Sequence, residues 1–493
     1  VVWRSFLQPV RLLDFWWHLK AGEVIVSSGS IPRTNIFSFT ASAPATVPHC
    51  WLSEAIYYLV YWVGGLPLLI VLNTALLVAA LLPVYHLCVE ECARRRLVIL
   101  AAVLPAGSLA LFSGMRPHVF SFMLLAVFYW VLAGFRRRRR DVLWVLPPLM
   151  ALWVNLHGAF VIGLGLIVLF LGCESVRRLV HGPVPGILSL SEFAKLALIL
   201  AACVLATLLN PEYYRVYSFV LEFGVNKYTF VTEWEVPRVN SMEGILTFHG
   251  AFFLTLLVLL VSRERLDLTE LALFLGFAAF GLAAYRNGVW FPLIAAPIVS
   301  RRLPSLEGPE LLKNLERFAP VRSLRRWVQH LFVSQATPSR SGLDIAFAAL
   351  LLGVTVILSP WVYPRLGIGW QHNGLLERET PVGAMDYIEQ HNLAGNIFHH
   401  QIYGDYLIWR LWPRHRSLFD SQVHFYGQPF FDDYASAFHD SHWEERLVSY
   451  DIAFLLLRNH AAEDQRIADA ARQSSGWRLL FEDELSVLFG RVQ

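Results

Sequence analysis

Ten apolar stretches recur along the chain, separated by short polar connections. A membrane-spanning helix needs about 20 apolar residues, or fewer when polar anchors flank its ends. Charged residues make up only 16% of the chain and hydrophobic residues 56%, which is too little polar surface for a soluble protein. The sequence therefore predicts an α-helical polytopic membrane protein with spans at roughly 66–90, 97–113, 119–135, 142–155, 158–174, 193–209, 246–262, 269–285, 288–300 and 343–361.

Arginines gather in every second connection between these stretches. Cytoplasmic loops of membrane proteins contain an excess of Lys and Arg, so these connections are predicted to be cytoplasmic. The opposite connections and the C-terminal segment are then extracytoplasmic. The chain begins at Val1 and reaches a polar outer loop by Asp14, which leaves open a further span upstream. The arginines are Arg94 to Arg96, Arg136 to Arg140, Arg177, Arg178, Arg263, Arg265, Arg301 and Arg302, the last two opening a basic connector at about 301–341.

Three regions follow from this topology. Residues 1–65 form a first outer loop with amphipathic helices, 66–364 form the membrane bundle, and 365–493 are soluble in character. The last region alternates expected helices and strands, which indicates a small extracytoplasmic α/β domain that covers the outer end of the bundle. Its helices are expected at about 381–392, 429–449 and 462–474, and its strands at about 396–402, 451–457, 477–481 and 485–489.

Asp14 is the strongest candidate for chemistry. It precedes the aromatic run Phe15-Trp16-Trp17, and His18, four residues later, is expected on the same helical face. A carboxylate in a partly apolar site at a membrane surface can act as a general base or hold a divalent cation. Asp is also a common helix N-cap, so capping is the alternative role.

Two parts of the chain resemble a known group of enzymes. The run from Asp14 to Glu23, residues 29–40 and the motif Trp51-Leu52-Ser53-Glu54 are similar to the first outer loop of bacterial GT-C-type membrane glycosyltransferases. The motifs at 404–407 and 419–421 resemble the C-terminal domain of uncharacterised members. This superfamily is similar in plan to oligosaccharyltransferases, protein O-mannosyltransferases and aminoarabinose transferases. The resemblance implies transfer of a sugar from a polyprenyl-phosphate-linked donor to an acceptor on the outer face.

The resemblance also implies roles for single residues. Asp14 matches the first-loop acid that serves as base or metal ligand, and Glu54 matches a second outer-loop acid; with His18 they form the predicted catalytic set. Many relatives have a second acid beside the position of Leu13, and an acid or amide at the position of Cys50. These departures weaken the case for a metal ion, so Mg²⁺ or Mn²⁺ at Asp14 is left open and no other cofactor is implied.

Four further residues are predicted to bind the donor. A lipid phosphate lies at headgroup depth, so cations that bind it must come from helix ends on the outer face. Arg116 and Arg286 are placed at such ends, and His118 and His157 can add hydrogen bonds. Interaction with bulk anionic lipid is the alternative role of these cations.

Other classes of function are less well supported. His399 and His400, as neighbours on a strand, would point to opposite faces, so they do not predict a zinc site. The arginine run at 136–140 has no folded basic module around it, which argues against nucleic-acid binding. The main alternative to a glycosyltransferase is a non-catalytic subunit or scaffold of a larger membrane complex. A bacterial inner-membrane location follows from the resemblance, with polyprenyl phosphate, membrane lipids and other protein subunits as expected partners.

Overall fold

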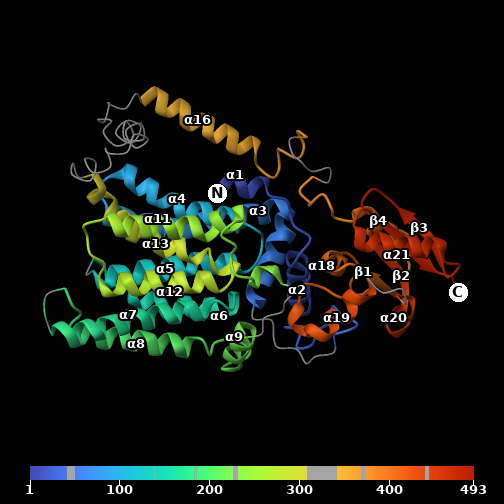
Figure 1. The fold of residues 1–493 in the computed structure, drawn as a ribbon, viewed down its shortest axis with the longest axis horizontal. Helices are drawn as coiled ribbons and strands as arrows, with labels where there is room; N and C mark the ends of the chain where they lie inside the picture. Colours follow the sequence, from blue (N-terminus) through green and yellow to red (C-terminus); the bar gives the residue numbers. More distant parts are fainter. Residues whose placement is uncertain are drawn as a thin grey trace.

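The structure is a computed structural model that describes residues 1–41, 50–137, 139–182, 184, 186–225, 231–307, 341–367, 374–438 and 443–492. Most of the predicted basic connector at 301–341 lies outside these residues. A bundle of helices extends along the long axis of the molecule, and a smaller domain with a four-stranded sheet lies at one end of it (Figure 1). The chain therefore has the helical bundle and the small C-terminal α/β unit that the sequence predicts.

All ten predicted apolar stretches are helical. They correspond to α3 (Trp51–Glu91), α4 (Arg95–Leu111), α5 (His118–Arg136), η1 with α6 (Leu143–Val145, Leu146–Leu156), α7 (Phe160–His181), α8 (Leu190–Ala206), η3 with α11 (Ile245–His249, Gly250–Val261), α12 (Leu268–Ala283), α13 (Trp290–Arg302) and α16 (Ser341–Ile357). Among the described residues, four helices are long and apolar enough to cross a membrane, namely α3, α5, α7 and the continuous helix Met242–Val261 that contains α10 (Met242–Gly244). The chain is thus a membrane protein, and the number of ten spans stays a prediction.

The centre of the bundle is α13, which is apolar on all sides. A helix without a polar face is buried by its neighbours, and every side chain from Trp290 to Ser300 is buried. The outer helices instead expose large apolar side chains, such as Leu198 on α8 and Leu260 on α11. Exposed leucines on helices of this length are typical of a surface that faces lipid.

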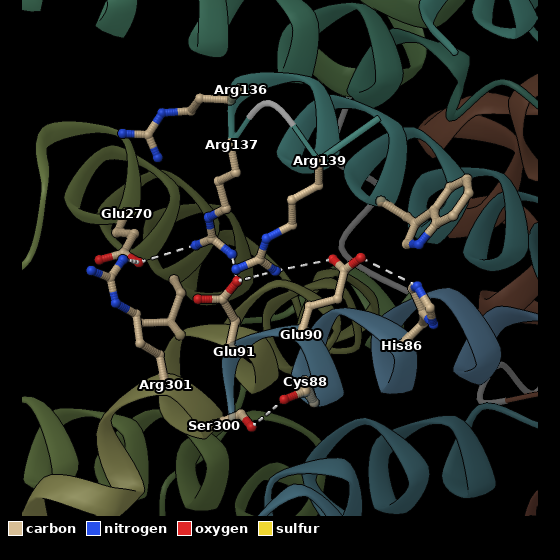
Figure 2. A network of polar contacts seen from close by, with 12 residues as sticks. His86, Cys88, Glu90, Glu91, Arg136, Arg137, Arg139, Glu270, Ser300 and Arg301 are labelled. Atoms are coloured by element: carbon tan, nitrogen blue, oxygen red, sulfur yellow. Dashed lines mark hydrogen bonds and ion pairs between the residues drawn. The ribbon is translucent and has the colours of Figure 1, made fainter. Parts of the chain in front are cut away.

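An ion-pair network closes the end of the bundle opposite the C-terminal domain. The arginines at the end of α5 and directly after it pair with acids from other helices (Figure 2). The shared acid of the network is Glu270 on α12, which is almost fully buried and also receives Arg302, itself fully buried, at 2.6 Å. Further pairs include Arg136 with Glu174 (2.8 Å) and Asp267 (3.1 Å), Arg137 with Glu91 and Glu270, Arg139 with Glu90 (3.2 Å), and Arg301 with Glu270 (3.0 Å).

The first outer loop folds against the other end of the bundle. It comprises α1 (Val2–Leu7), α2 (Phe15–Ser28) and the first part of α3, which breaks at Gly64 and Gly65. Gly65 has φ +63, a backbone conformation that residues other than glycine rarely adopt. At Gly22 a Cβ atom would lie 2.0 Å from the Glu54 carbonyl oxygen. Glycine therefore allows α2 to pack directly on the first turn of α3.

The C-terminal domain is a mixed sheet with helices around it. Its strand order is β1-β2-β4-β3, with β1 parallel to β2 and β4 antiparallel to both of its neighbours. The elements are α17 (Val382–Gln390), β1 (Asn396–His399), α18 (Gln401–Leu411), η6 (Val423–Phe425), α19 (Gly427–Ala437), α20 (Trp443–Ser449), β2 (Ile452–Arg458), α21 (Ala462–Gln473), β3 (Trp477–Glu482) and β4 (Ser486–Arg491). The predicted terminal hairpin is present as β3 and β4.

Two elements of this domain differ from the prediction. The strand expected at 396–402 ends at His399, because the side chain of His400 accepts a hydrogen bond from the Ile402 amide and caps α18. The helix expected at 429–449 corresponds to α19, which ends at Ala437, and to α20, which begins at Trp443, and residues 439–442 lie outside the described residues. The extra helix α18 packs on α2 of the outer loop, where the rings of Trp16 and Tyr406 lie 5.0 Å apart. This contact joins the domain to the segment that contains Asp14.

Candidate active site

Asp14 has a strained backbone. Its φ of 49 and ψ of −52 are those of a classic γ-turn, and the Phe15 amide donates to the Leu13 carbonyl oxygen at 2.5 Å. Such conformations cost on the order of 1–3 kcal/mol and persist only where surrounding structure fixes them. Although Asp14 directly precedes α2, its side chain forms no cap on this helix, all of which is described. Helix capping is therefore not the role of the carboxylate.

The carboxylate of Asp14 instead forms an ion pair with Arg116. This arginine lies between α4 and α5, and its other terminal nitrogen donates to Glu233 Oε1 at 2.6 Å. Burial lowers the pKa of the Arg116 guanidinium, but the carboxylates of Asp14 and Glu233 outweigh it and the net shift is upward. Burial likewise acts to raise the pKa of Glu233, and Arg116 reverses that shift to a net lowering. A fixed positive charge thus lies directly against the candidate base.

The C-terminal domain contributes two buried acids beside this pair. The Asp14 amide donates to Asp405 Oδ2 at 2.7 Å, and Asp405 also accepts hydrogen bonds from the amide and the hydroxyl of Ser421. Asp420 accepts from the Tyr426 hydroxyl at 2.6 Å. Burial raises the pKa of Asp405 well above its usual range, with Asp420 and Asp14 adding to the shift, and burial raises the pKa of Asp420 to about 6.

His18 and Glu54 form a separate pair. The Nδ1 atom of His18 lies 2.8 Å from Glu54 Oε1, and Glu54 is fully buried at the start of α3. The second carboxylate oxygen of Glu54 has no hydrogen-bond partner among the described residues. The sequence predicts His18 on the same face as Asp14. The structure places its ring against Glu54, because the γ-turn takes Asp14 off the helical path of α2.

Arg286 lies within electrostatic reach of Glu233. It belongs to η4 (Tyr285–Asn287), and its guanidinium lies over the ring of Trp234 in η2 (Thr232–Trp234), 4.9 Å from the centroid. The Tyr285 amide donates to the Glu235 carbonyl at 2.7 Å, which fixes these two segments together. Burial lowers the pKa of Arg286 to about 10. The charges of Arg286 and Arg116 therefore interact both with Glu233 and with each other.

His157 has a defined tautomer. Its Nδ1 accepts a hydrogen bond from the Ala159 amide at 3.3 Å and lies 2.9 Å from the Ser121 hydroxyl. Because an amide can only donate, Nδ1 is an acceptor and the ring proton of the neutral imidazole is on Nε2. Ser121 in turn accepts from Trp153 Nε1 at 2.7 Å. His157 is thus held as an Nε2–H donor.

His118 lies next to His157 but has different hydrogen-bond partners. Their ring centroids are 6.5 Å apart. The Nε2 atom of His118 lies 3.4 Å from the carbonyl oxygen of Phe112, and a carbonyl can only accept, so Nε2 carries the proton. The structure therefore brings together Arg116, His118, His157 and Arg286 at the end of the bundle where Asp14 lies.

The donor set around Asp14 does not fit a divalent cation. Mg²⁺ and Mn²⁺ bind clusters of oxygen atoms, whereas the carboxylate of Asp14 faces the guanidinium of Arg116. In the described part of the chain, His400, Glu463 and Asp464 bring three possible ligand atoms within 4.8 Å in the C-terminal domain. There, Arg458 donates to both carboxylate oxygens of Asp464. In both groups, a positively charged guanidinium therefore lies against the carboxylate to which a metal ion would bind.

Comparison with known proteins gives a clear result for the fold. No family model matches the chain, and no curated protein matches it by sequence. Among solved structures, the Archaeoglobus fulgidus oligosaccharyltransferase AglB in complex with an inhibitory peptide and a dolichol-phosphate is similar, with a TM-score of 0.56 at 13% identity over 98% of this chain and 71% of that one. ArnT from Cupriavidus metallidurans bound to undecaprenyl phosphate matches with a TM-score of 0.52 at 13% identity over 100% of this chain and 96% of that one. The apo form of the A. fulgidus enzyme gives 0.54 at 14% identity.

These similarities identify the class of fold. The chain has a GT-C-like fold, as the outer-loop motifs predict. At such low identity the likeness concerns the fold alone, so the roles of single residues rest on the geometry described above.

Sequence reasoning did not assign Asp405 and Glu233 to the site. Asp405 lies in one of the motifs that resemble the C-terminal domain of GT-C proteins, but nothing local indicates that it reaches Asp14, 391 residues away. One signal was present in the sequence. Gly404 directly precedes Asp405, and a Cβ atom there would lie 2.3 Å from the Phe419 carbonyl oxygen. A glycine that allows such a close approach predicts a neighbour packed tightly against this turn of helix.

Proposed function

We propose that this protein is a membrane glycosyltransferase that moves a sugar from a polyprenyl-phosphate-linked donor to an acceptor on the outer face of the membrane. The observation on which the proposal depends is the ion pair between Asp14 and Arg116. It joins a candidate base, held in a strained turn and not used as a helix cap, to a cation suited to a phosphate. The GT-C-like fold supports it, because the similar structures include complexes with dolichol-phosphate and undecaprenyl phosphate.

In the proposed reaction Asp14 is the general base. The acceptor hydroxyl transfers its proton to the Asp14 carboxylate as its oxygen forms a bond to the anomeric carbon of the donor. The bond between that carbon and the phosphate oxygen breaks on the opposite side, with inversion, and the electron pair leaves with the polyprenyl phosphate. General-base catalysis contributes on the order of 10²–10⁴-fold in rate.

The departing phosphate is stabilised by the neighbouring cations. Arg116 offers a planar set of donors that suits phosphate oxygens, and Arg286, whose charge also interacts with Glu233, adds a second guanidinium. His157 adds an Nε2–H donor, fixed by its bonds to Ser121 and Ala159, and His118 lies beside it. When the phosphate binds, Arg116 exchanges part of its pairing with Glu233 for the phosphate.

Glu54 and His18 have a supporting role in this proposal. Their buried pair lies between α2 and α3, where it fixes the packing of the outer loop. Because the ring of His18 faces Glu54, neither residue receives the acceptor proton directly. The C-terminal domain covers the site from the extracytoplasmic side. The arginine-rich end of the bundle lies on the cytoplasmic side of a bacterial inner membrane.

Native mass spectrometry tests the donor assignment. The purified wild-type protein should retain a polyprenyl phosphate, and Arg286→Gln should weaken its retention. A hydrogen bond to a charged group is worth about 1.5–3 kcal/mol, which corresponds to a loss of roughly 10–100-fold in affinity. Arg414→Gln is the matched control, since Arg414 is exposed and pairs with Asn392 at 2.7 Å. Equal retention by the two variants, or no retention by the wild type after addition of the lipid, would contradict the proposal.

A further inference from the structure

The backbone of the segment that contains Asp14 is hydrogen-bonded to the C-terminal domain. The backbone amides of alternate residues donate to this domain: Val10 to the Leu375 carbonyl at 2.9 Å, Leu12 to Glu377 Oε2 at 3.0 Å, and Asp14 to Asp405 Oδ2 at 2.7 Å. The Glu377 amide donates back to the Val10 carbonyl at 3.0 Å. All three amides therefore donate to residues more than 360 positions away along the chain.

Asp405 accepts the hydrogen bond from the last of these three amides, and its position is fixed by its surroundings. Its side chain is fully buried, and the amide and hydroxyl of Ser421 fix its orientation. Its two oxygens accept three hydrogen bonds in all, from the Asp14 amide and from the amide and hydroxyl of Ser421, so the carboxyl group has a fixed position. The amide of Asp14 is thereby drawn toward the domain, and the turn that forms at Asp14 is the strained γ-turn. The hydrogen bond to Asp405 therefore stabilises the strained backbone conformation of Asp14.

We propose that Asp405 is a positioning residue, which fixes the turn that directs the Asp14 carboxylate toward Arg116, so that the C-terminal domain controls the geometry of the active site. This inference rests on the proposed function for its kinetic consequence, but its structural consequence is independent of it. Without Asp405 the turn relaxes toward an ordinary helix start, where an aspartate at this position caps its own helix. The carboxylate then points to the amides of α2 and away from Arg116.

Hydrogen exchange on the full-length protein in nanodiscs tests the structural part. In Asp405→Ala the amides of residues 12–15 should exchange faster, while those of the later turns of α2 stay as in the wild type. Asp405→Asn should restore part of the protection, because its amide oxygen can still accept the Asp14 N–H. Asp420→Asn is the matched control: Asp420 is equally buried in the same domain, and its hydrogen bonds remain within that domain. Unchanged exchange at 12–15 in Asp405→Ala would overturn the proposal.

Kinetics then separate positioning from a merely structural role. Misplacement of a reacting group by about 1 Å can cost 10²-fold, so Asp405→Ala should lower kcat by that order with KM for the donor unchanged, and Asp405→Asn should recover part of the rate. If Asp14→Asn abolishes activity but Asp405→Ala exchanges faster without any loss of kcat, the positioning role is overturned. If Asp14→Asn itself left the rate unchanged, the proposed function would fail, and the exchange result would still decide what holds the turn.

Discussion

Replacing Asp14 with asparagine removes the charge of the candidate base and little else. Asparagine is among the side chains that best tolerate a positive φ, so the γ-turn with φ 49 should remain. The ion pair with Arg116 is lost, but it is partly exposed, and Arg116 keeps Glu233 as a partner. Partly exposed pairs contribute about 1 kcal/mol or less. We therefore expect a small loss of stability and a fall in transfer rate on the order of 10²–10⁴-fold.

The measurement is the transfer rate of purified variants in proteoliposomes, with thermal unfolding in the same detergent as the stability control. Glu233→Gln is the matched variant, because it removes a carboxylate from the same guanidinium without removing the base. Its rate should fall much less than that of Asp14→Asn. Asp14→Ala is uninformative alone, since alanine also adds strain at a positive φ. A variant Asp14→Asn with the wild-type rate, or equal losses in the two variants, would refute the assignment of Asp14 as the base.

Three other predictions concern the rest of the molecule. Glu270→Gln should destabilise the protein by about 3–5 kcal/mol in thermal unfolding, because it leaves the fully buried Arg302 without its carboxylate; a change below about 1 kcal/mol would contradict this. Burial raises the pKa of Asp420 to about 6, so its contribution to stability is complete below its unfolded pKa of 3.8 and is lost as the pH rises through about 6. Asp420→Asn should therefore flatten the fall in stability across that range, and an unaltered pH profile would argue against it. All five cysteines, each within the described ranges, are buried and free; an impermeant thiol reagent added outside cells should label a cysteine at Glu389 but not one at Arg95, and the reverse pattern would invert the topology.

The bundle could be predicted from sequence because its signal is local. Each apolar stretch is long enough to identify a helix by itself, and the ten stretches are all helical. The terminal hairpin is likewise visible as two short apolar runs. The strand at Asn396 was predicted too long because its end depends on a cap by His400, a single side chain whose role the apolar pattern does not reveal.

The site could be predicted only in part, for a physical reason. The motif around Asp14 identifies the residue, but its conformation is imposed by Asp405 across the full length of the chain. Local rules therefore favour a helix cap at Asp14 and a face shared with His18, and both expectations fail at the γ-turn. The arginines near Arg136 do cluster at one end of the bundle, and their cytoplasmic location stays a prediction. Their acidic partners, such as Glu270, lie as far as 133 residues away along the chain. Such pairings are properties of the tertiary fold.

We propose that this protein transfers sugar from a polyprenyl-phosphate-linked donor, with Asp14 as the base. The most direct measurement supplies proteoliposomes with radiolabelled polyprenyl-phosphate sugars and an extract of cell-envelope acceptors, and follows both the label and the freed lipid phosphate. The wild type should move label to an acceptor and release polyprenyl phosphate in equal amounts, while Asp14→Asn should still bind the donor lipid but release none. Binding without turnover in both proteins would contradict the claim and would identify a non-catalytic subunit of a larger membrane complex.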